Sequence, residues 1–499
     1  MNVEDGGQIT SAMALEADVV VVGSGPAGAA VARTLARAGL GVVVVEEGPW
    51  AREVHADGLR SLAALYRDMG ATVALGSPPM PVLQGRLVGG TSVVNGAICW
   101  RLPRDVWDEW VADDPALADA LPWAEIEAVT TDIERDLHIA PTDPAIAGPH
   151  NLLLARGAAA LGLEHRPIRR NVHGCRGLGR CLQGCPEGNK LSMDRSYLVD
   201  AAHDGARILS GTRVERVVVE RGRARGIQAR TTGGARVTVR AGTAVVLACS
   251  AVQTPLLLRA SGLDEGPVGD GFQAHPGISV AGVFREEVRM WTGATQGHEV
   301  IGLRREGIKF EALGYDVALV AMRAKGYGGA LGEELAELAE VAHWGAAVRA
   351  RARGRVRRGL LGTSIRYTLD PEDLRRVQRG VRVLGELFLA AGAQVVYPGV
   401  HGWHERITDR ASMARFEEEA PRDPNAYTLA ATHLFGTCRM GSERPRSVVR
   451  PDFRHHGVAH LYVADSSVFP TNIGVNPQLP ILALATLCGR RILTAHRAL

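Results

Sequence analysis

The chain has no long apolar segment and no strong excess of charge of either sign. Its 499 residues carry a net charge of +3, and 46% of them are hydrophobic. No apolar run approaches the roughly 20 residues that cross a bilayer, and residues 1–18 lack the basic-then-apolar pattern of a secretory signal. The sequence therefore predicts a cytoplasmic protein without a membrane span, and its charge gives no reason to expect a nucleic-acid partner.

Aromatic residues and lysines are also scarce. Aromatic residues make up 5% of the chain, so a binding site built as a cage of stacked rings is not indicated. Lysine occurs only at Lys190, Lys309 and Lys325, and arginine carries the remaining positive charge. The composition is that of an ordinary globular protein.

The chain has seven cysteines, and four of them stand alone in apolar stretches. These four are expected to be small buried side chains: Cys99, Cys249, Cys438 and Cys488. The other three, Cys175, Cys181 and Cys185, lie within eleven positions. A cytoplasmic location weighs against a disulfide there, and a zinc ion would need a fourth ligand, for which His173 is the near candidate.

Residues 17–49 have the pattern of a complete β-α-β unit. Val19–Val22 is a continuous β-branched run, as expected for a parallel strand buried on both faces. A glycine-rich turn follows, then a helical stretch over Ala29–Ala38, and Val42–Val45 predicts the second strand.

The turn carries the spacing of a dinucleotide-binding site. Gly23 permits a tight turn, Gly25 lets the backbone approach a pyrophosphate, and Gly28 allows close packing of helix on strand. The start of the helix supplies free N–H groups to the phosphates. Glu46, at the end of the second strand, is placed to accept hydrogen bonds from ribose hydroxyls.

Strand patterns return far along the chain and suggest a discontinuous nucleotide-binding domain. They occur at Ala206–Leu209, Val214–Val219, Arg236–Arg240, Ala244–Ala248 and Leu461–Asp465. Between them, residues 275–425 contain two predicted helices, Gly332–Val348 and Pro371–Ala391. A chain of this length also exceeds what one hydrophobic core usually serves, so two domains are expected.

Several motifs occur together and in a fixed order. They are the unit at 17–49, GRLVGGTSVVNGAICWR at 85–101, SAVQTPLLLRASGL at 250–263, THLFGTCRMG at 432–441 and VADSSVFPTNIGVNPQLPILALA at 463–485. As an ordered set they resemble the glucose–methanol–choline (GMC) family of FAD-dependent oxidoreductases. The resemblance implies an α/β fold with a Rossmann-like FAD-binding domain made of residues 15–100, 190–274 and 425–499. Residues 101–189 and 275–424 would form a second, α+β substrate-binding domain.

The resemblance also implies which residues hold the FAD. The expected set is Gly23, Gly25, Pro26, Ala27, Gly28, Glu46, Glu47, Arg86, Gly89, Gly90, Thr91, Ser92, Asn95, Gly96, Val214, Ser250, Asp465, Val475, Asn476 and Pro477. Some relatives link FAD through a histidine one residue before the asparagine that matches Asn95. That position is Val94 here, so a non-covalent FAD is expected.

Asn95 and Asp465 each have two alternative roles, and Asn476 with Pro477 predicts the start of a helix. Asn95 either hydrogen-bonds near the flavin ring or caps a turn, and Asp465 either holds a ribityl hydroxyl or caps the turn that follows. Asn476 and Pro477 suit the cap and the first position of the last helix. The helix dipole would stabilise negative charge on the reduced flavin.

His433 and Asn476 match the catalytic pair of the family. An alcohol must lose its hydroxyl proton as a hydride leaves for flavin N5, and histidine suits that general-base task. Asn476 would orient the substrate oxygen. The expected function is oxidation of a primary or secondary alcohol, a small-molecule substrate, with oxygen, a quinone or a protein as electron acceptor.

Two alternatives stay open. One is a non-redox family member, such as a lyase or decarboxylase. The other is an Fe–S flavoprotein subunit of a multi-component dehydrogenase, because one branch of the family binds a three-iron cluster through cysteines spaced like Cys175, Cys181 and Cys185. The same spacing also fits thiols packed in a loop, so no metal is assigned.

Overall fold

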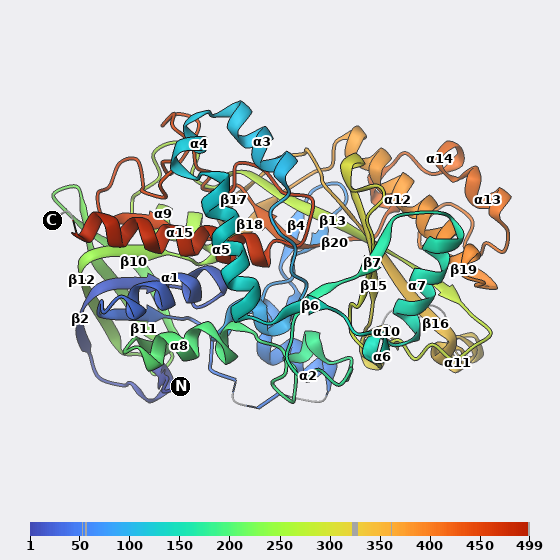
Figure 1. The fold of residues 1–499 in the computed structure, drawn as a ribbon, viewed down its shortest axis with the longest axis horizontal. Coiled ribbons are helices and arrows are strands. Elements are labelled where there is room, and N and C mark those ends of the chain that lie inside the picture. Colours follow the sequence, from blue (N-terminus) through green and yellow to red (C-terminus); the bar gives the residue numbers. More distant parts are fainter. Residues whose placement is uncertain (52, 55–56, 322–327, 361, 498–499) are drawn as a thin grey trace.

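The computed structural model describes the chain apart from residues 52, 55–56, 322–327, 361 and 498–499. Its main feature is two β-sheets that lie side by side and form two halves (Figure 1). One half carries helices α1, α5, α8 and α15, and the other carries α7 and α12. Each sheet has its own hydrophobic core.

The first sheet has a parallel centre and an antiparallel edge. In the described residues it runs β1 (Glu4–Asp5), β9 (Arg207–Ser210), β3 (Val42–Val45), β2 (Met13–Val22), β12 (Arg236–Leu247), β11 (Arg223–Thr231) and β10 (Thr212–Glu220), with β21 (Leu461–Val463) also on β12. Val19–Val22 pairs in register with Val42–Val45 on one side and Ala244–Leu247 on the other. These valines are buried on both faces, as their continuous β-branched pattern predicts.

The predicted elements of this half are largely confirmed. The two strands predicted at 236–240 and 244–248 form one strand, β12, with a register shift between Ala241 and Ala244. Helix α1 (Pro26–Arg37) begins three residues before the predicted start, because proline is well suited to the first turn of a helix.

Helices cover the first sheet and come from distant parts of the sequence. α1 packs on α15 (Gln478–Arg497) and on α8 (Tyr197–His203), and α15 also contacts α5 (Trp123–Asp136). Helices α3 (Arg104–Asp113) and α4 (Ala116–Ala120) add buried side chains to the same core. Several separate segments of the chain therefore contribute to this half, among them residues 104–136.

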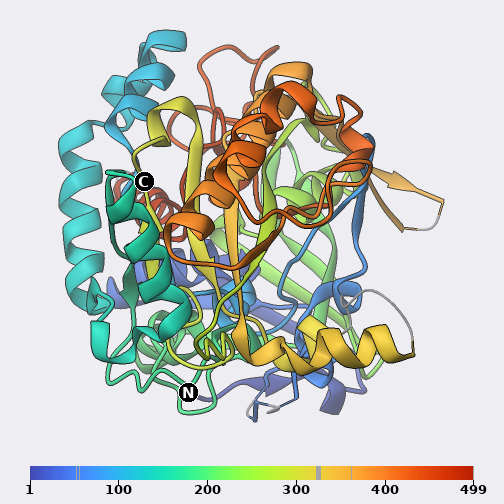
Figure 2. The same ribbon diagram turned by 90° about the vertical axis from the view of Figure 1, so that its right-hand side faces the viewer.

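The second sheet is built around one long strand. β13 (Asp270–Val283) pairs with β16 (Val341–Val348), β17 (Gly354–Gly359), β19 (Val395–Tyr397) and β20 (Leu429–Phe435). The sheet extends through β15 (Ile308–Leu313), β14 (His298–Val300) and β7 (His165–Pro167) at one end, and through β18 (Gly362–Arg366), β4 (Val73–Leu75) and β5 (Met80–Pro81) at the other. The β17–β18 hairpin projects from the body (Figure 2).

One predicted helix in this half is wrong. Residues 332–348 divide into the end of α11 (Gly329–Ala336) and strand β16. Along β16 buried and partly exposed residues alternate, with Ala342, Trp344 and Ala346 facing the core, which is the period of a strand. The other predicted helix is confirmed as α12 (Pro371–Ala390), with Asp370 as its N-cap.

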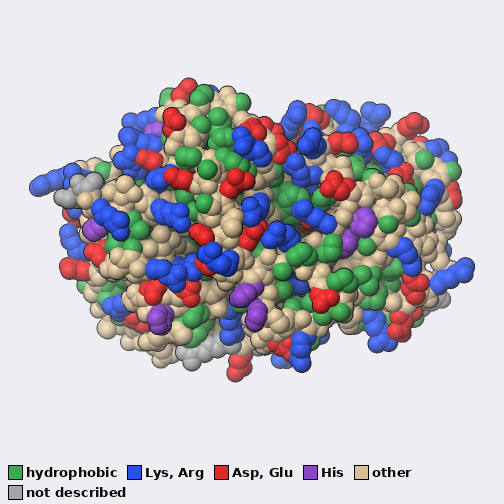
Figure 3. Space-filling view, in the orientation of Figure 1, with side chains coloured by type: hydrophobic (Ala, Val, Ile, Leu, Met, Phe, Trp, Pro, Cys, Tyr) green, Lys and Arg blue, Asp and Glu red, His purple; other side chains and the backbone are tan. Residues whose placement is uncertain are grey.

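The remaining elements are short or connect the two halves. They are α2 (Gly58–Leu65), α6 (Pro144–Ala147), α7 (Pro149–Ala160), α9 (Ser250–Ala260), α10 (Val317–Ala321), α13 (Arg410–Ala414), α14 (Phe416–Glu419), and the pair β6 (Ile139–Pro141) and β8 (Arg169–Asn171). Basic and acidic side chains are interspersed over the face seen in Figure 3. Within the described ranges, no helix combines the length and the hydropathy that crossing a membrane requires.

Candidate active site

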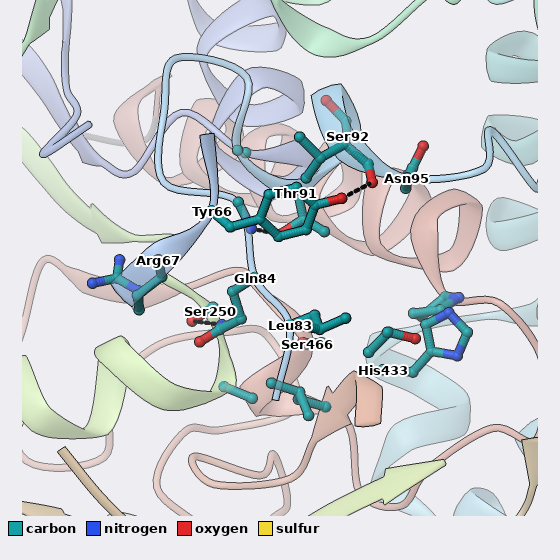
Figure 4. Close-up of a pocket in the computed structure, with 18 of the residues that line it drawn as sticks. Tyr66, Arg67, Leu83, Gln84, Thr91, Ser92, Asn95, Ser250, His433 and Ser466 are labelled. Carbon is teal, nitrogen blue, oxygen red and sulfur yellow. Dashed lines mark hydrogen bonds between the residues drawn. The ribbon is translucent and has the colours of Figure 1, made fainter. Parts of the chain in front are cut away.

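A cavity of about 1240 Å³ runs between the two sheets. Most of the residues predicted from sequence line it, from the N-terminal turn at one end to His433 at the other. The lining includes Gly23, Gly25, Pro26, Ala27, Glu46, Glu47, Gly90, Thr91, Ser92, Asn95, Gly96, Val214, Ser250, His433, Asp465, Asn476 and Pro477. Figure 4 shows His433 at one side of the cavity and Arg67 at the other.

Four predicted residues do not line the cavity. Gly28 instead packs helix on strand, since a Cβ there would lie 1.9 Å from the carbonyl oxygen of Gly23. Gly89 adopts φ +94° at the start of the next turn, and Val475 belongs to the hydrophobic core. Arg86 is exposed.

The N-terminus of α1 forms an open cradle. Gly25 caps the helix without a side-chain hydrogen bond, so backbone N–H groups of the first turn remain available to an anion. A Cβ on Gly25 would meet only the Cα of Gly90, at 3.9 Å. The two glycine turns themselves are in close backbone contact, since a Cβ on Gly90 would lie 2.7 Å from the Cα of Gly25.

Glu46 is held at the edge of this cradle. Its carboxylate accepts hydrogen bonds from the backbone N–H and hydroxyl of Ser24 and from the backbone N–H of Gly48, at 2.7–3.0 Å. Burial raises the pKa of Glu46, and the charge of Glu47 adds to that effect. Ser24 also accepts from the Gly89 N–H, a link between the two turns that the sequence did not reveal.

Residues 90–96 form the wall beside the cradle, and their polar side chains also hold the wall itself. Thr91 accepts from the N–H of Gly85, and Ser92 donates to the Gly89 carbonyl and accepts from the N–H of Met193. Asn95 accepts from the Ala97 N–H and donates to Gln478. The turn-capping role of Asn95 is thus present in the structure.

Asp465 likewise shows the capping alternative. Its carboxylate accepts from the N–H groups of Ser467 and Ser250 and from the hydroxyl of Thr254. Burial raises the pKa of Asp465, and the hydrogen bonds from these donors offset that rise only in part. Ser250 has a φ of +90° and accepts from the Gln84 side chain at 3.0 Å (Figure 4).

The last helix begins one residue later than predicted. α15 starts at Gln478, and the carbonyl of Pro477 accepts from the Ile481 N–H. Asn476 therefore does not act as the expected cap. Its Oδ1 instead accepts from the ammonium group of Lys309 at 2.7 Å.

His433 and His275 face each other at a bulge in the sheet. His433 lies on β20, and the register between β20 and β13 shifts around His275. The two Nδ1 atoms are 3.2 Å apart, and the Gly474 N–H lies 2.9 Å from Nε2 of His275. Burial lowers the pKa of His433 to about 4 and the pKa of His275 well below its usual value.

Sequence reasoning missed a cluster of charged residues at the same end of the cavity. Lys309, Glu311 and Glu299 lie buried together behind Asn476. A signal was available, because charged and apolar residues alternate in the stretch IKFEAL and lysine is rare in this chain. Tyr66, Arg67 and Gln84 also line the cavity.

Two of the three clustered cysteines lie against a buried cation. Arg170 lies 3.1 Å from the sulfur of Cys181 and 3.9 Å from that of Cys175. Burial raises the pKa of Cys181, but Arg170 and Lys190 outweigh it and lower the pKa overall. Among the described residues, no group of three or more His, Cys, Asp or Glu side chains is arranged to hold a metal ion.

Comparison with known proteins identifies the family. A GMC oxidoreductase model matches residues 62–277, a second matches residues 350–485, and an FAD-binding domain model matches residues 16–72. A GMC-type oxidoreductase of Mycobacterium tuberculosis is 39% identical over 94% of this chain and 74% of its own length. This chain belongs to the GMC oxidoreductase family.

Other GMC proteins are more distant. A long-chain-alcohol oxidase of Arabidopsis thaliana is 27% identical over 96% of this chain and 69% of its own length. The solved formate oxidase of Aspergillus oryzae has a TM-score of 0.76 at 15% identity and covers 98% of this chain and 100% of that one. This second likeness concerns the fold.

The cavity fits the FAD that the family match implies. The uncapped N-terminus of α1 suits a pyrophosphate, and the absence of a side chain at Gly25 and Gly90 leaves the backbone there open to it. Asn95 and both histidines line the same cavity, so a bound FAD would lie in the space that His433 and His275 also face. This GMC protein therefore has an FAD site whose walls are already formed by its own hydrogen bonds.

Gly25→Ala separates cofactor binding from folding. Because the protein itself leaves space at this Cβ, we expect the variant to fold with an unchanged midpoint of thermal unfolding in its FAD-free form. The methyl group would lie where the pyrophosphate approaches the backbone, so FAD content after purification should fall sharply. Absorbance of the bound flavin and circular dichroism of the apoprotein measure the two effects.

Gly28→Ala is the matched comparison. Its Cβ would collide with the Gly23 carbonyl, so this variant should lose stability by about 1–3 kcal/mol. A Gly25→Ala protein that keeps its FAD, or that unfolds as readily as Gly28→Ala, contradicts the assignment of the cradle.

Proposed function

We propose that this GMC oxidoreductase oxidises a primary or secondary alcohol, with His433 as the general base and Asn476 as the residue that orients the substrate oxygen. The observation that carries the proposal is that His433 and Asn476 both line the cavity, and that burial and the charge of Lys309, which contacts Asn476, both lower the pKa of His433. When bound, FAD supplies the acceptor for the hydride. Val94, which lines the cavity, has no group able to form a covalent link, so the FAD is held non-covalently.

The low pKa of His433 keeps the ring in the unprotonated form that a base needs. A ring whose pKa is about 4 is neutral at physiological pH and so has a lone pair available for the hydroxyl proton. The protonated ring that results is disfavoured by burial and by Lys309 and is favoured by the charge of Glu311. The hydroxyl proton therefore moves to a nitrogen from which it is readily released again.

The proposal also sets the protonation of the second histidine. If His433 accepts at Nε2, its own proton lies on Nδ1 and points to Nδ1 of His275. His275 then carries its proton on Nε2. The nearby side chain of Asn472 raises the pKa of His275 against the effect of burial. Oδ1 of Asn472 has no hydrogen-bond partner among the described residues. The Gly474 N–H donates to Nε2 of His275 and so favours the tautomer with its proton on Nδ1. For His433 to act as a base through Nε2, His275 must give up this contact and donate from Nε2 to Asn472 instead.

The apolar part of the lining is consistent with an alcohol. Leu83, Ile278, Leu313 and Leu429 line the cavity together with His433. A named alcohol oxidase among the relatives supports the same class of substrate. Oxygen, a quinone or a protein then takes the electrons from the reduced flavin.

Anaerobic mixing with a panel of alcohols tests the function. A substrate should bleach the oxidised flavin of the wild-type protein. His433→Ala should slow this reduction by about 10²–10⁴-fold while FAD stays bound, because the proton has no acceptor. Product formation with a flavin that stays oxidised would favour the lyase alternative, and unchanged reduction in His433→Ala would show that another group is the base.

The pH dependence of flavin reduction provides a separate prediction. Since the pKa of His433 is lowered to about 4, the ring is deprotonated above that value and loses its base function below it. The reduction rate constant should be level from about pH 5 to 8 and should fall as the pH approaches 4. Stopped-flow measurement with the best panel alcohol gives the profile, and a fall centred near pH 6.5 would be inconsistent with the buried ring described here.

A further inference from the structure

A buried ammonium group stands directly behind Asn476. Lys309 and Glu311 lie two residues apart on β15, so both side chains emerge on the same face of the sheet. Glu299 on β14 is the register partner of Glu311, which places the two carboxylates side by side. Lys309 and Glu299 are each 1% exposed, which excludes water as their main partner.

The ammonium group uses all three of its protons. It contacts Glu299 Oε2 at 2.7 Å, Asn476 Oδ1 at 2.7 Å, and a carboxylate oxygen of Glu311. An ammonium has three donors and no acceptor, so each proton has one assigned oxygen. Burial lowers the pKa of Lys309, but the two glutamates outweigh burial and raise it overall, which keeps the group charged.

The carboxylates are themselves held in place. Glu299 also accepts from the indole N–H of Trp100 at 2.7 Å and from Arg166 at 2.8 Å. Glu311 also accepts from the Gln296 side chain at 2.8 Å. Because the two carboxylates are fixed by other donors, they fix the position of the ammonium group. That position brings its third N–H to Asn476.

This contact decides which way the Asn476 amide faces. Lysine can only donate, so the amide atom beside it must be the carbonyl oxygen. The NH₂ group then points away from Lys309. The described residues provide no hydrogen-bond acceptor for that NH₂ group, and the side chain lines the cavity.

We infer that Lys309 is a positioning residue that holds Asn476 with its N–H edge turned to the substrate oxygen. The inference rests on the proposed function, in which Asn476 contacts that oxygen. A charge-assisted bond at the carbonyl also polarises the amide, so its N–H groups become stronger donors. Such a donor stabilises an oxygen on which negative charge develops as its proton leaves.

The competing explanation is that Lys309 only neutralises the two glutamates. Both explanations predict damage from Lys309→Met in the wild-type chain, because that change leaves two buried carboxylates without their cation. A background of Glu311→Gln removes this difficulty, since Glu299 then keeps Arg166 as its partner when Lys309 is replaced. In that background, the coupling between Lys309 and Asn476 separates the explanations.

The first experiment is a double-mutant cycle on stability, read without turnover. In the Glu311→Gln background, Asn476→Leu takes the acceptor from one buried N–H of Lys309, and the unfolding temperature should fall by about 2–4 °C. With Lys309→Met also present, the same change should lower it by less than about 1 °C. Equal losses in the two backgrounds would show that the contact does not form, and would overturn the inference.

The second experiment repeats the cycle on the rate constant of anaerobic flavin reduction. With Asn476 present, Lys309→Met should slow reduction by about tenfold or more, because the amide is free to turn. With Asn476→Leu present, it should slow reduction by less than about twofold. Equal slowing in both backgrounds would mean that Lys309 does not act through Asn476.

A charge-balanced pair elsewhere serves as the control. Arg491→Met with Glu125→Gln removes an ion pair between α15 and α5, away from the cavity. This double change should leave the coupling between Lys309 and Asn476 unaltered, both in unfolding temperature and in the rate constant of flavin reduction. If no alcohol in the panel reduces the wild-type flavin, the proposed function fails, while the stability cycle still decides whether Lys309 orients Asn476.

Discussion

The hydrogen bond between Lys309 and Asn476 joins the two halves of the molecule at the wall of the cavity between the sheets. Lys309 belongs to the second sheet, and Asn476 lies two residues before the start of α15, which packs in the first half. The same end of the cavity carries His433 from β20 and His275 from β13. A buried charge of the second sheet and its partners thus fix a side chain that precedes the last helix of the first half.

The cofactor site depends on a different kind of constraint. Its turns at Gly25 and Gly90 approach each other closely, and the side chains of Ser24, Glu46 and Ser92 each form a hydrogen bond with the surrounding backbone. Many polar groups that the motifs suggest as cofactor ligands therefore also hold the walls. This explains why a rigid pocket can be formed by loops, which by themselves are the more mobile part of a fold.

Local sequence patterns predicted the first half of the fold well. The valine runs at 19–22 and 42–45 and the glycine turn between them specify strand, turn and helix without reference to the rest of the chain. The prediction of a helix over residues 332–348 was wrong because their alanine-rich sequence favours a helix locally. Residues 341–348 form strand β16 because they pair with β13 and β15. Pairing between strands far apart in sequence cannot be read from a local pattern.

The candidate site shows the same division. His433 and Asn476 could be proposed from motifs, but Lys309, Glu299 and Glu311 act through contacts that only the folded sheet creates. The three cysteines illustrate the reverse case. Their spacing left a metal site open, and the structure places the guanidinium of Arg170 against two of their sulfurs.

The central claim is that the carbinol hydrogen of an alcohol leaves as a hydride while His433 receives the hydroxyl proton. The most direct test is anaerobic single-turnover reduction of the flavin by an alcohol deuterated at the carbinol carbon, compared with the unlabelled alcohol. The account predicts that deuteration slows bleaching of the flavin. Product formation from either alcohol with the flavin still oxidised would contradict it.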